Sequence, residues 1–98
     1  MSSSATHRIL VVDDEAIVVS LVRDALEDEE YDILTASSGQ EALDILSHEQ
    51  LHLLVTDIRM PNMDGIELVR RARERQPDLG IIFMTGYFVG YCVNERSH

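Results

Sequence analysis

Hydrophobic residues along this chain alternate between short continuous runs and stripes with a helical period. Four short apolar runs predict β-strands, over residues 8–12, 31–36, 51–56 and 79–84. After Glu15, apolar residues recur at the three- and four-residue spacing of one helical face: Val18, Leu21, Val22 and Ala25. Strands that alternate with helices of about 10–15 residues indicate βαβ units. We therefore expect a parallel sheet with helices on both faces.

Polar residues mark the ends of the predicted helices. The acidic run 27–30 is unfavourable at a helix C-terminus, so the first helix should end there. Residues 38–41, Ser-Gly-Gln-Glu, match a capping box that opens a second helix. A third helix should follow Gly65 and stop at Pro77. Its apolar positions are Ile66, Leu68, Val69 and Ala72.

Composition indicates a globular protein and limits the classes of molecule that it is expected to bind. With 98 residues, 45% of them apolar, the chain should form one domain with a real core. Eighteen acidic residues face eight arginines and no lysine, for a formal net charge of −10. Such a chain suits a divalent cation or a basic protein partner, and we expect no direct binding to nucleic acid. No apolar run approaches the roughly 20 residues that span a bilayer, so no membrane segment is expected.

Acidic residues follow two of the predicted strands. Asp13 and Asp14 come after the first strand and Asp57 after the third, so neighbouring strands would bring three carboxylates to one edge of the sheet. Like charges at that distance raise each other's pKa, and Mg²⁺, which prefers oxygen ligands, would neutralise them. The hydroxyl of Thr85, after the fourth strand, would then donate to a phosphoryl oxygen. The alternative is local: Asp13 and Asp14 cap the first helix, and Asp57 begins a turn.

Three segments resemble the signature segments of response-regulator receiver domains, the phosphoacceptor modules of two-component signalling. They are residues 11–15 (VVDDE), 57–65 (DIRMPNMDG) and 83–87 (FMTGY). The resemblance implies a flavodoxin-like, doubly wound parallel α/β sheet, truncated to about four strands and three helices. The chain would then divide into a disordered leader (1–7), a receiver-like domain (8–86) and an atypical tail (87–98).

The resemblance also implies a role for each matching residue. Asp57 would be the phosphoacceptor, taking phosphate from a histidine kinase or a phosphotransfer protein. Asp14 would be a direct Mg²⁺ ligand and Asp13 a ligand through a metal-bound water, with Asp57 and the backbone carbonyl of Arg59 completing the site. Thr85 would be the switch hydroxyl. The protein would catalyse at most its own phosphorylation and dephosphorylation. Independently of the resemblance, the single cysteine, Cys92, fits a reducing cytoplasm.

The chain departs from the family at its C-terminal end. Receiver domains usually have a fifth strand ending in a lysine and then a fifth helix, and this chain contains no lysine. We therefore expect impaired phosphoryl transfer. A degenerate receiver, acting as a protein-interaction module without phosphorylation, is the alternative. A Mg²⁺-dependent phosphohydrolase is less favoured, because that class usually needs an acid at the position of Arg59.

The shortened end also affects the fourth strand. This strand would become a sheet edge, uncovered at Ile81, Ile82 and Phe83, and apolar edges invite pairing with another chain. One hypothesis is a homodimer or swapped assembly in which the fourth strand and the arm 87–93 cover each other. The other is that the arm folds back within the same chain. The sequence leaves the arm open as a short strand, an irregular segment or a frayed helix.

Overall fold

A computed structural model describes residues 7–27, 30–85 and 88–93 of the chain, with the backbone alone for Thr85 and for the last of these ranges. Its elements are β1 (His7–Val12), α1 (Ala16–Leu26), β2 (Tyr31–Ala36), α2 (Gly39–Leu46), β3 (Leu53–Asp57), α3 (Gly65–Arg75), β4 (Gly80–Thr85) and β5 (Phe88–Val93). Within the described ranges, no helix is long and apolar enough to cross a membrane.

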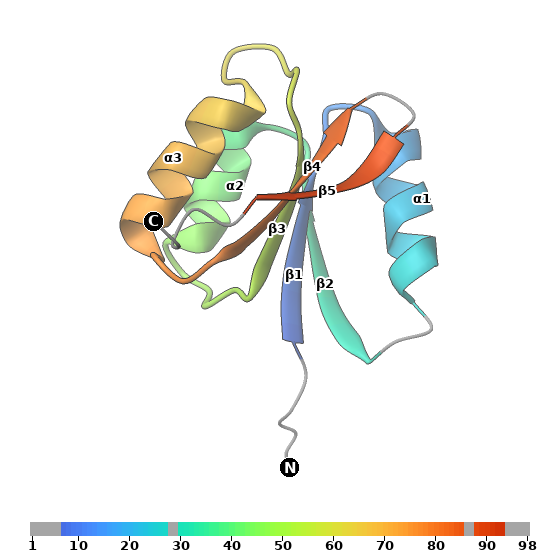
Figure 1. Ribbon diagram of the computed structural model, residues 1–98, viewed down its shortest axis with the longest axis horizontal. Coiled ribbons are helices and arrows are strands. Elements are labelled where there is room, and N and C mark those ends of the chain that lie inside the picture. Colours follow the sequence, from blue (N-terminus) through green and yellow to red (C-terminus); the bar gives the residue numbers. More distant parts are fainter. Residues whose placement is uncertain (1–6, 28–29, 86–87, 94–98) are drawn as a thin grey trace.

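The strands form one sheet in the order β2-β1-β3-β4-β5. β1 lies at the centre, parallel to β2 on one side and to β3 on the other, and β3 is parallel to β4. α2 and α3 cover one face of the sheet, and α1 lies on the other (Figure 1). The predicted fold, four parallel strands with three helices in a flavodoxin-like arrangement, is confirmed. β1 begins at His7, the last residue of the predicted leader.

The larger core lies between the sheet and the α2–α3 layer. Leu10, Leu54 and Leu68 are fully enclosed there, and Ala42, Leu43 and Leu46 of α2 are buried beside them. Apolar burial of this kind is the dominant favourable contribution to folding. Ile66 is not part of this core, since 55% of it is exposed.

The face covered by α1 is packed less completely. Ile9, Val11, Val55 and Met84 are buried on this side of the sheet, but no residue of α1 is buried. The predicted inward face of α1 is therefore wrong in part. Val18 and Val22 pack against the sheet, whereas Leu21 is 63% exposed and Ala25 is also exposed.

The tail supplies a fifth strand. β5 runs antiparallel to β4, and the pairing skips Gly90 because Phe83 pairs with Tyr91 while Met84 pairs with Val89. One extra residue on one strand is a β-bulge, which bends and twists the pair. Of the two hypotheses for the arm, the structure has the intrachain one: β5 covers the edge of β4.

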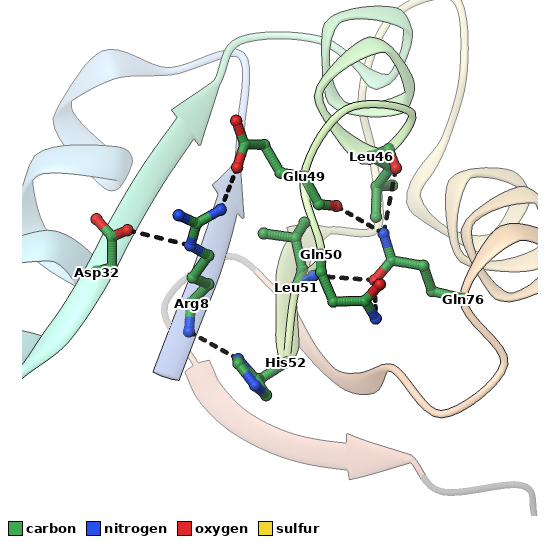
Figure 2. A network of polar contacts seen from close by, with 8 residues as sticks. All are labelled: Arg8, Asp32, Leu46, Glu49, Gln50, Leu51, His52 and Gln76. Atoms are coloured by element: carbon green, nitrogen blue, oxygen red, sulfur yellow. Dashed lines mark hydrogen bonds and ion pairs between the residues drawn. The ribbon is translucent and has the colours of Figure 1, made fainter. Parts of the chain in front are cut away.

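A buried glutamine joins the end of α3 to the segment between α2 and β3 (Figure 2). The Gln76 side chain, 8% exposed, donates to the carbonyls of Leu46 (3.1 Å) and Glu49 (2.8 Å). Its Oε1 accepts from the backbone N–H of Leu51 at 2.9 Å and from Gln50 Nε2 at 3.3 Å. The amide thus satisfies backbone groups that the helix end and the loop leave unpaired.

Beside it, Arg8 ties β1 to its neighbours at the same end of the sheet. Its guanidinium pairs with Asp32 at 3.3 Å and with Glu49, and its backbone N–H donates to His52 Nδ1 at 2.9 Å (Figure 2). These side chains are about half exposed, so the ion pairs contribute little stability.

Gln76→Leu should lower the free energy of unfolding by about 2–4 kcal/mol, because buried backbone groups lose their partners. Gln50→Ala, which removes one long bond at an exposed residue, should lower it by less than about 1 kcal/mol. Urea unfolding followed by circular dichroism measures both. Equal losses in the two variants would contradict the structural role of Gln76.

Candidate functional site

Three carboxylates meet at the carboxyl edge of the sheet. Val12 pairs with Thr56 across β1 and β3, so the next residues, Asp13 and Asp57, leave their strands side by side. Carboxylate oxygens of Asp13, Asp14 and Asp57 lie within 4.8 Å of one another. Asp13 is buried, Asp57 is intermediate and Asp14 is exposed, so the cluster opens from the sheet edge toward solvent. The sequence prediction that these three acids converge is confirmed by this geometry.

Backbone hydrogen bonds hold two of the carboxylates in place. Asp13 Oδ1 accepts from the N–H of Glu15 at 2.9 Å, and Asp57 Oδ1 accepts from the N–H of Arg59 at 3.2 Å. The helix-capping alternative is not what the structure has, because Glu15 is the N-cap of α1 and no side chain caps that end. Asp57 does begin a turn, as the local alternative also expected, and that turn orients its carboxylate.

Burial and repulsion make Asp13 hard to ionise. Its pKa is raised from 3.8 to about 6, first because burial removes water from the charged form, and further because Asp57 and Asp14 stand close by. The hydrogen bond from Glu15 lowers the pKa, and its effect is smaller than that of burial but larger than that of either neighbouring aspartate. The cluster therefore favours any cation that lies between the three carboxylates.

The loop after Asp57 depends on a glycine. An ideal Cβ on Gly65 would lie 2.1 Å from the carbonyl oxygen of Asp57, so no side chain fits there. The N–H of Gly65 donates to the carbonyl of Ile58 at 2.8 Å, which closes the loop against the strand end. Asn62 has φ 74° within this loop, a conformation that asparagine adopts more readily than most residues. Asp64 then caps α3 by accepting from the N–H of Glu67 at 2.8 Å.

Two predicted site residues are only partly placed. Thr85 ends β4 one residue beyond Met84, which pairs with Asp57, so its backbone is at the same sheet edge. Its side chain lies outside what the structure describes, and the switch role stays a prediction. Arg59 is exposed and acts on Asp57 through its N–H. The metal-ligand role of its carbonyl also stays a prediction.

A hollow of about 330 Å³ adjoins the cluster between α1 and β2. Asp13 and Asp14 line it, together with Arg23 and Glu41. Sequence reasoning did not single out Arg23, since nothing in the pattern of α1 separates an arginine beside the site from one in solvent. Glu41 is held by the N–H and hydroxyl of Ser37, both at 2.9 Å, and these bonds lower its pKa.

Comparisons with known proteins show the family of the chain. The family model described as "Response regulator receiver domain" matches residues 9–89. The chain is 45% identical over 90 residues to "Response regulator receiver protein CpdR" of Brucella abortus, covering 92% of this chain and 74% of that protein. It is 35% identical over 81 residues to "Sporulation initiation phosphotransferase F" of Bacillus subtilis, covering 83% of this chain and 65% of that protein.

A solved structure gives the same picture in three dimensions. The response regulator protein TrrA from Thermotoga maritima, in complex with Mg(2+)-BeF, superimposes with a TM-score of 0.78 at 39% identity. The match covers 84% of this chain and 71% of that one. The fold of the described residues is thus shared with a protein whose structure holds magnesium and a fluoride compound of beryllium.

Asp13→Asn should change stability in a pH-dependent way. The pKa of Asp13 is higher in the folded than in the unfolded chain, so its protonation favours folding at pH 4 and this contribution is lost as pH rises through about 6. With divalent cations chelated, the variant should be about 1–3 kcal/mol more stable than the wild type at pH 7.5, and nearly equal to it at pH 4. Urea unfolding at the two pH values tests this. A difference in unfolding free energy that does not vary with pH would show that Asp13 is not the group whose ionisation destabilises the fold.

Proposed function

The chain belongs to the response-regulator receiver domain family, and we propose that it is a phosphoacceptor module in which Asp57 takes a phosphoryl group with Mg²⁺ in the acidic pocket. The observation that supports the proposal most directly is the convergence of three carboxylates within 4.8 Å at the end of β3. Hard oxygen donors of this number and charge suit Mg²⁺. The pKa of Asp13 is raised first by burial and further by the nearby Asp57 and Asp14, and a divalent cation would stabilise its charged form.

In this proposal the three aspartates bind Mg²⁺ in different ways. Asp14, the most exposed of the three, would bind Mg²⁺ directly, and buried Asp13 would act through a metal-bound water. Asp57 and the carbonyl of Arg59 would supply the remaining protein ligands. The bound ion would neutralise the cluster and stabilise charge on the phosphoryl oxygens.

Asp57 is the nucleophile of the proposed reaction. One of its carboxylate oxygens forms a bond to phosphorus while the phosphorus–nitrogen bond to the donor histidine breaks, and the electron pair of that bond returns to the imidazole. The N–H of Arg59 keeps one carboxylate oxygen of Asp57 oriented. Thr85 is proposed to donate its hydroxyl to the phosphoryl group, since β4 ends at this edge.

The proposed donor is a histidine kinase or a phosphotransfer protein of the cytoplasm. The similarity to a protein named as a phosphotransferase supports this class of partner. A net charge of −10 favours a donor with a basic docking surface and argues against direct nucleic-acid binding. A homodimer through the fourth strand and the tail is also proposed, because β5 lies next to β4 at the edge of the sheet, where another chain could pair with it.

Because the chain contains no lysine, we expect its phosphoryl transfer to be slow. No described arginine forms an ion pair with the three aspartates: the ion pairs in these ranges involve Arg8, Arg70 and Arg71. With no protein cation fixed there, phosphoryl transfer should be slower than in relatives that carry the lysine. The same observation favours the second candidate function, a receiver that binds partners without being phosphorylated.

Phosphorylation at Asp57 can be read directly by mass. Incubation with acetyl phosphate or phosphoramidate and Mg²⁺ should add one phosphoryl group to the wild type and none to Asp57→Asn. Asp64→Asn is the matched control, because it changes a nearby exposed aspartate while asparagine keeps the N-cap of α3. No gain in the wild type, despite Mg²⁺ binding, would favour the non-phosphorylated module.

Replacing Asp14 should weaken Mg²⁺ binding, whereas replacing an exposed acid elsewhere should not. Asp14→Asn should weaken binding by at least about tenfold, because a direct ligand is lost. Asp24→Asn, on the exposed side of α1, should leave it unchanged. Isothermal titration calorimetry measures both, and equal affinities in the two variants would contradict the proposed ligand set.

A further inference from the structure

The loop between β3 and α3 contacts the start of α2 through the side chain of Met63. A Cβ atom added to Gly39, the first residue of α2, would lie 2.8 Å from Met63 Sδ, 3.1 Å from its Cβ and 3.2 Å from its Cγ. Gly39 is buried, and Met63 is partly buried against the larger core. The Met63 side chain therefore lies against Gly39, in space that the Cβ of any other residue would enter.

This contact extends to the backbone of the loop. The Sδ end of a methionine can swing aside, but Met63 Cβ is bonded to the loop backbone and would itself lie 3.1 Å from the added atom. Carbon atoms in contact prefer a separation of about 3.5–4.0 Å. A larger residue in place of Gly39 should therefore displace the loop at Met63 and not only the end of its side chain.

The same loop orients Asp57. Two backbone hydrogen bonds of 2.8 Å, one donated by Met63 and one by Gly65, brace it internally. The N–H of Arg59, also in the loop, donates to Asp57 Oδ1 at 3.2 Å. Because these bonds tie the loop into one braced unit, a displacement at Met63 should reach the carboxylate of Asp57.

The start of α2 is fixed to the other side of the acidic pocket. The N–H of Asp13 donates to the carbonyl of Ala36, the last residue of β2, at 3.2 Å. The next residue, Ser37, donates its N–H and its hydroxyl to Glu41 of α2, both at 2.9 Å. The corner between β2 and α2 is thus held to Asp13 at one end, and it presents Gly39 to the loop at the other.

We infer that Gly39 and Met63 are positioning residues of the acidic pocket, because their contact fixes the loop that orients Asp57 relative to the corner that holds Asp13. The inference rests on the proposed function, since it concerns how that pocket binds Mg²⁺. Residues that orient metal ligands without binding the ion typically change metal affinity or activity about 10–100-fold when they are replaced. A shift of the ligands by about 0.5 Å is enough to impair a site.

Gly39→Ala tests the contact because it adds one methyl group. It should weaken Mg²⁺ binding about tenfold in isothermal titration calorimetry. Alanine favours a helix more than glycine does, so weakening of α2 would not explain the loss. In a Met63→Ala background two of the three close atoms are gone, and adding Gly39→Ala should then weaken binding by less than about threefold relative to Met63→Ala alone.

Gly80→Ala is the matched control. Its added Cβ would also meet a side chain, Leu53 Cδ1 at 3.3 Å, but Gly80 begins β4 at the end of the sheet away from the aspartates. Its Mg²⁺ affinity should equal that of the wild type, and circular dichroism confirms that each variant is folded. Unchanged affinity in Gly39→Ala, the same loss in the Met63→Ala background, or an equal loss in Gly80→Ala would each overturn the inference.

A second measurement needs no metal. In two-dimensional NMR spectra without Mg²⁺, the amide resonance of Arg59 should move in Gly39→Ala, because that N–H donates to Asp57. The same substitution should move it less in the Met63→Ala background. A wild type that binds no Mg²⁺ would contradict the proposed function, and this resonance then decides the inference alone. An Arg59 resonance that stays in place in Gly39→Ala would overturn it.

Discussion

Electrostatic repulsion among Asp13, Asp14 and Asp57 is the constraint on which the rest of this structure depends. Parallel pairing of β1 with β3 places the acids together, and the close approach of Gly65 to Asp57 keeps the loop tight around them. The three carboxylates lie close together only in the folded chain, so their mutual repulsion destabilises the fold. A densely packed core between the sheet and the α2–α3 layer offsets this destabilisation, as is usual for functional sites.

The parts of the fold that follow from apolar runs could be predicted from sequence. All four parallel strands lie within two residues of the predicted positions, because a short, continuous apolar run has few other stable solutions. The acidic site could be predicted for a related reason: once the strands are parallel, their carboxyl ends share one edge. Ser38 also caps α2 as expected, although Glu41 reaches back to Ser37 instead of Ser38.

Other features are not encoded in a local pattern. The inward face of α1 could not be assigned reliably, because eight apolar residues among eleven fit several faces equally well. The residues of β5 lack a clean hydrophobic period, so their strand could not be predicted from a local pattern. They form a strand because they pair with the edge of β4. The Gln76 network joins residues 25–30 positions apart, and no spacing rule identifies a glutamine that binds backbone groups at such separations.

The central position of β1 has a consequence for the order in which the protein is made. Ile9 of β1 pairs with Leu53 of β3, 44 residues later in the chain. At a synthesis rate of roughly 5–20 residues per second, the central strand waits roughly 2–9 s for its second neighbour. During that interval β1 has no strand neighbour other than β2, and a two-stranded sheet is only marginally stable by itself. The acidic pocket is complete only after β3 has emerged, so a nascent chain becomes competent for metal binding late in its synthesis.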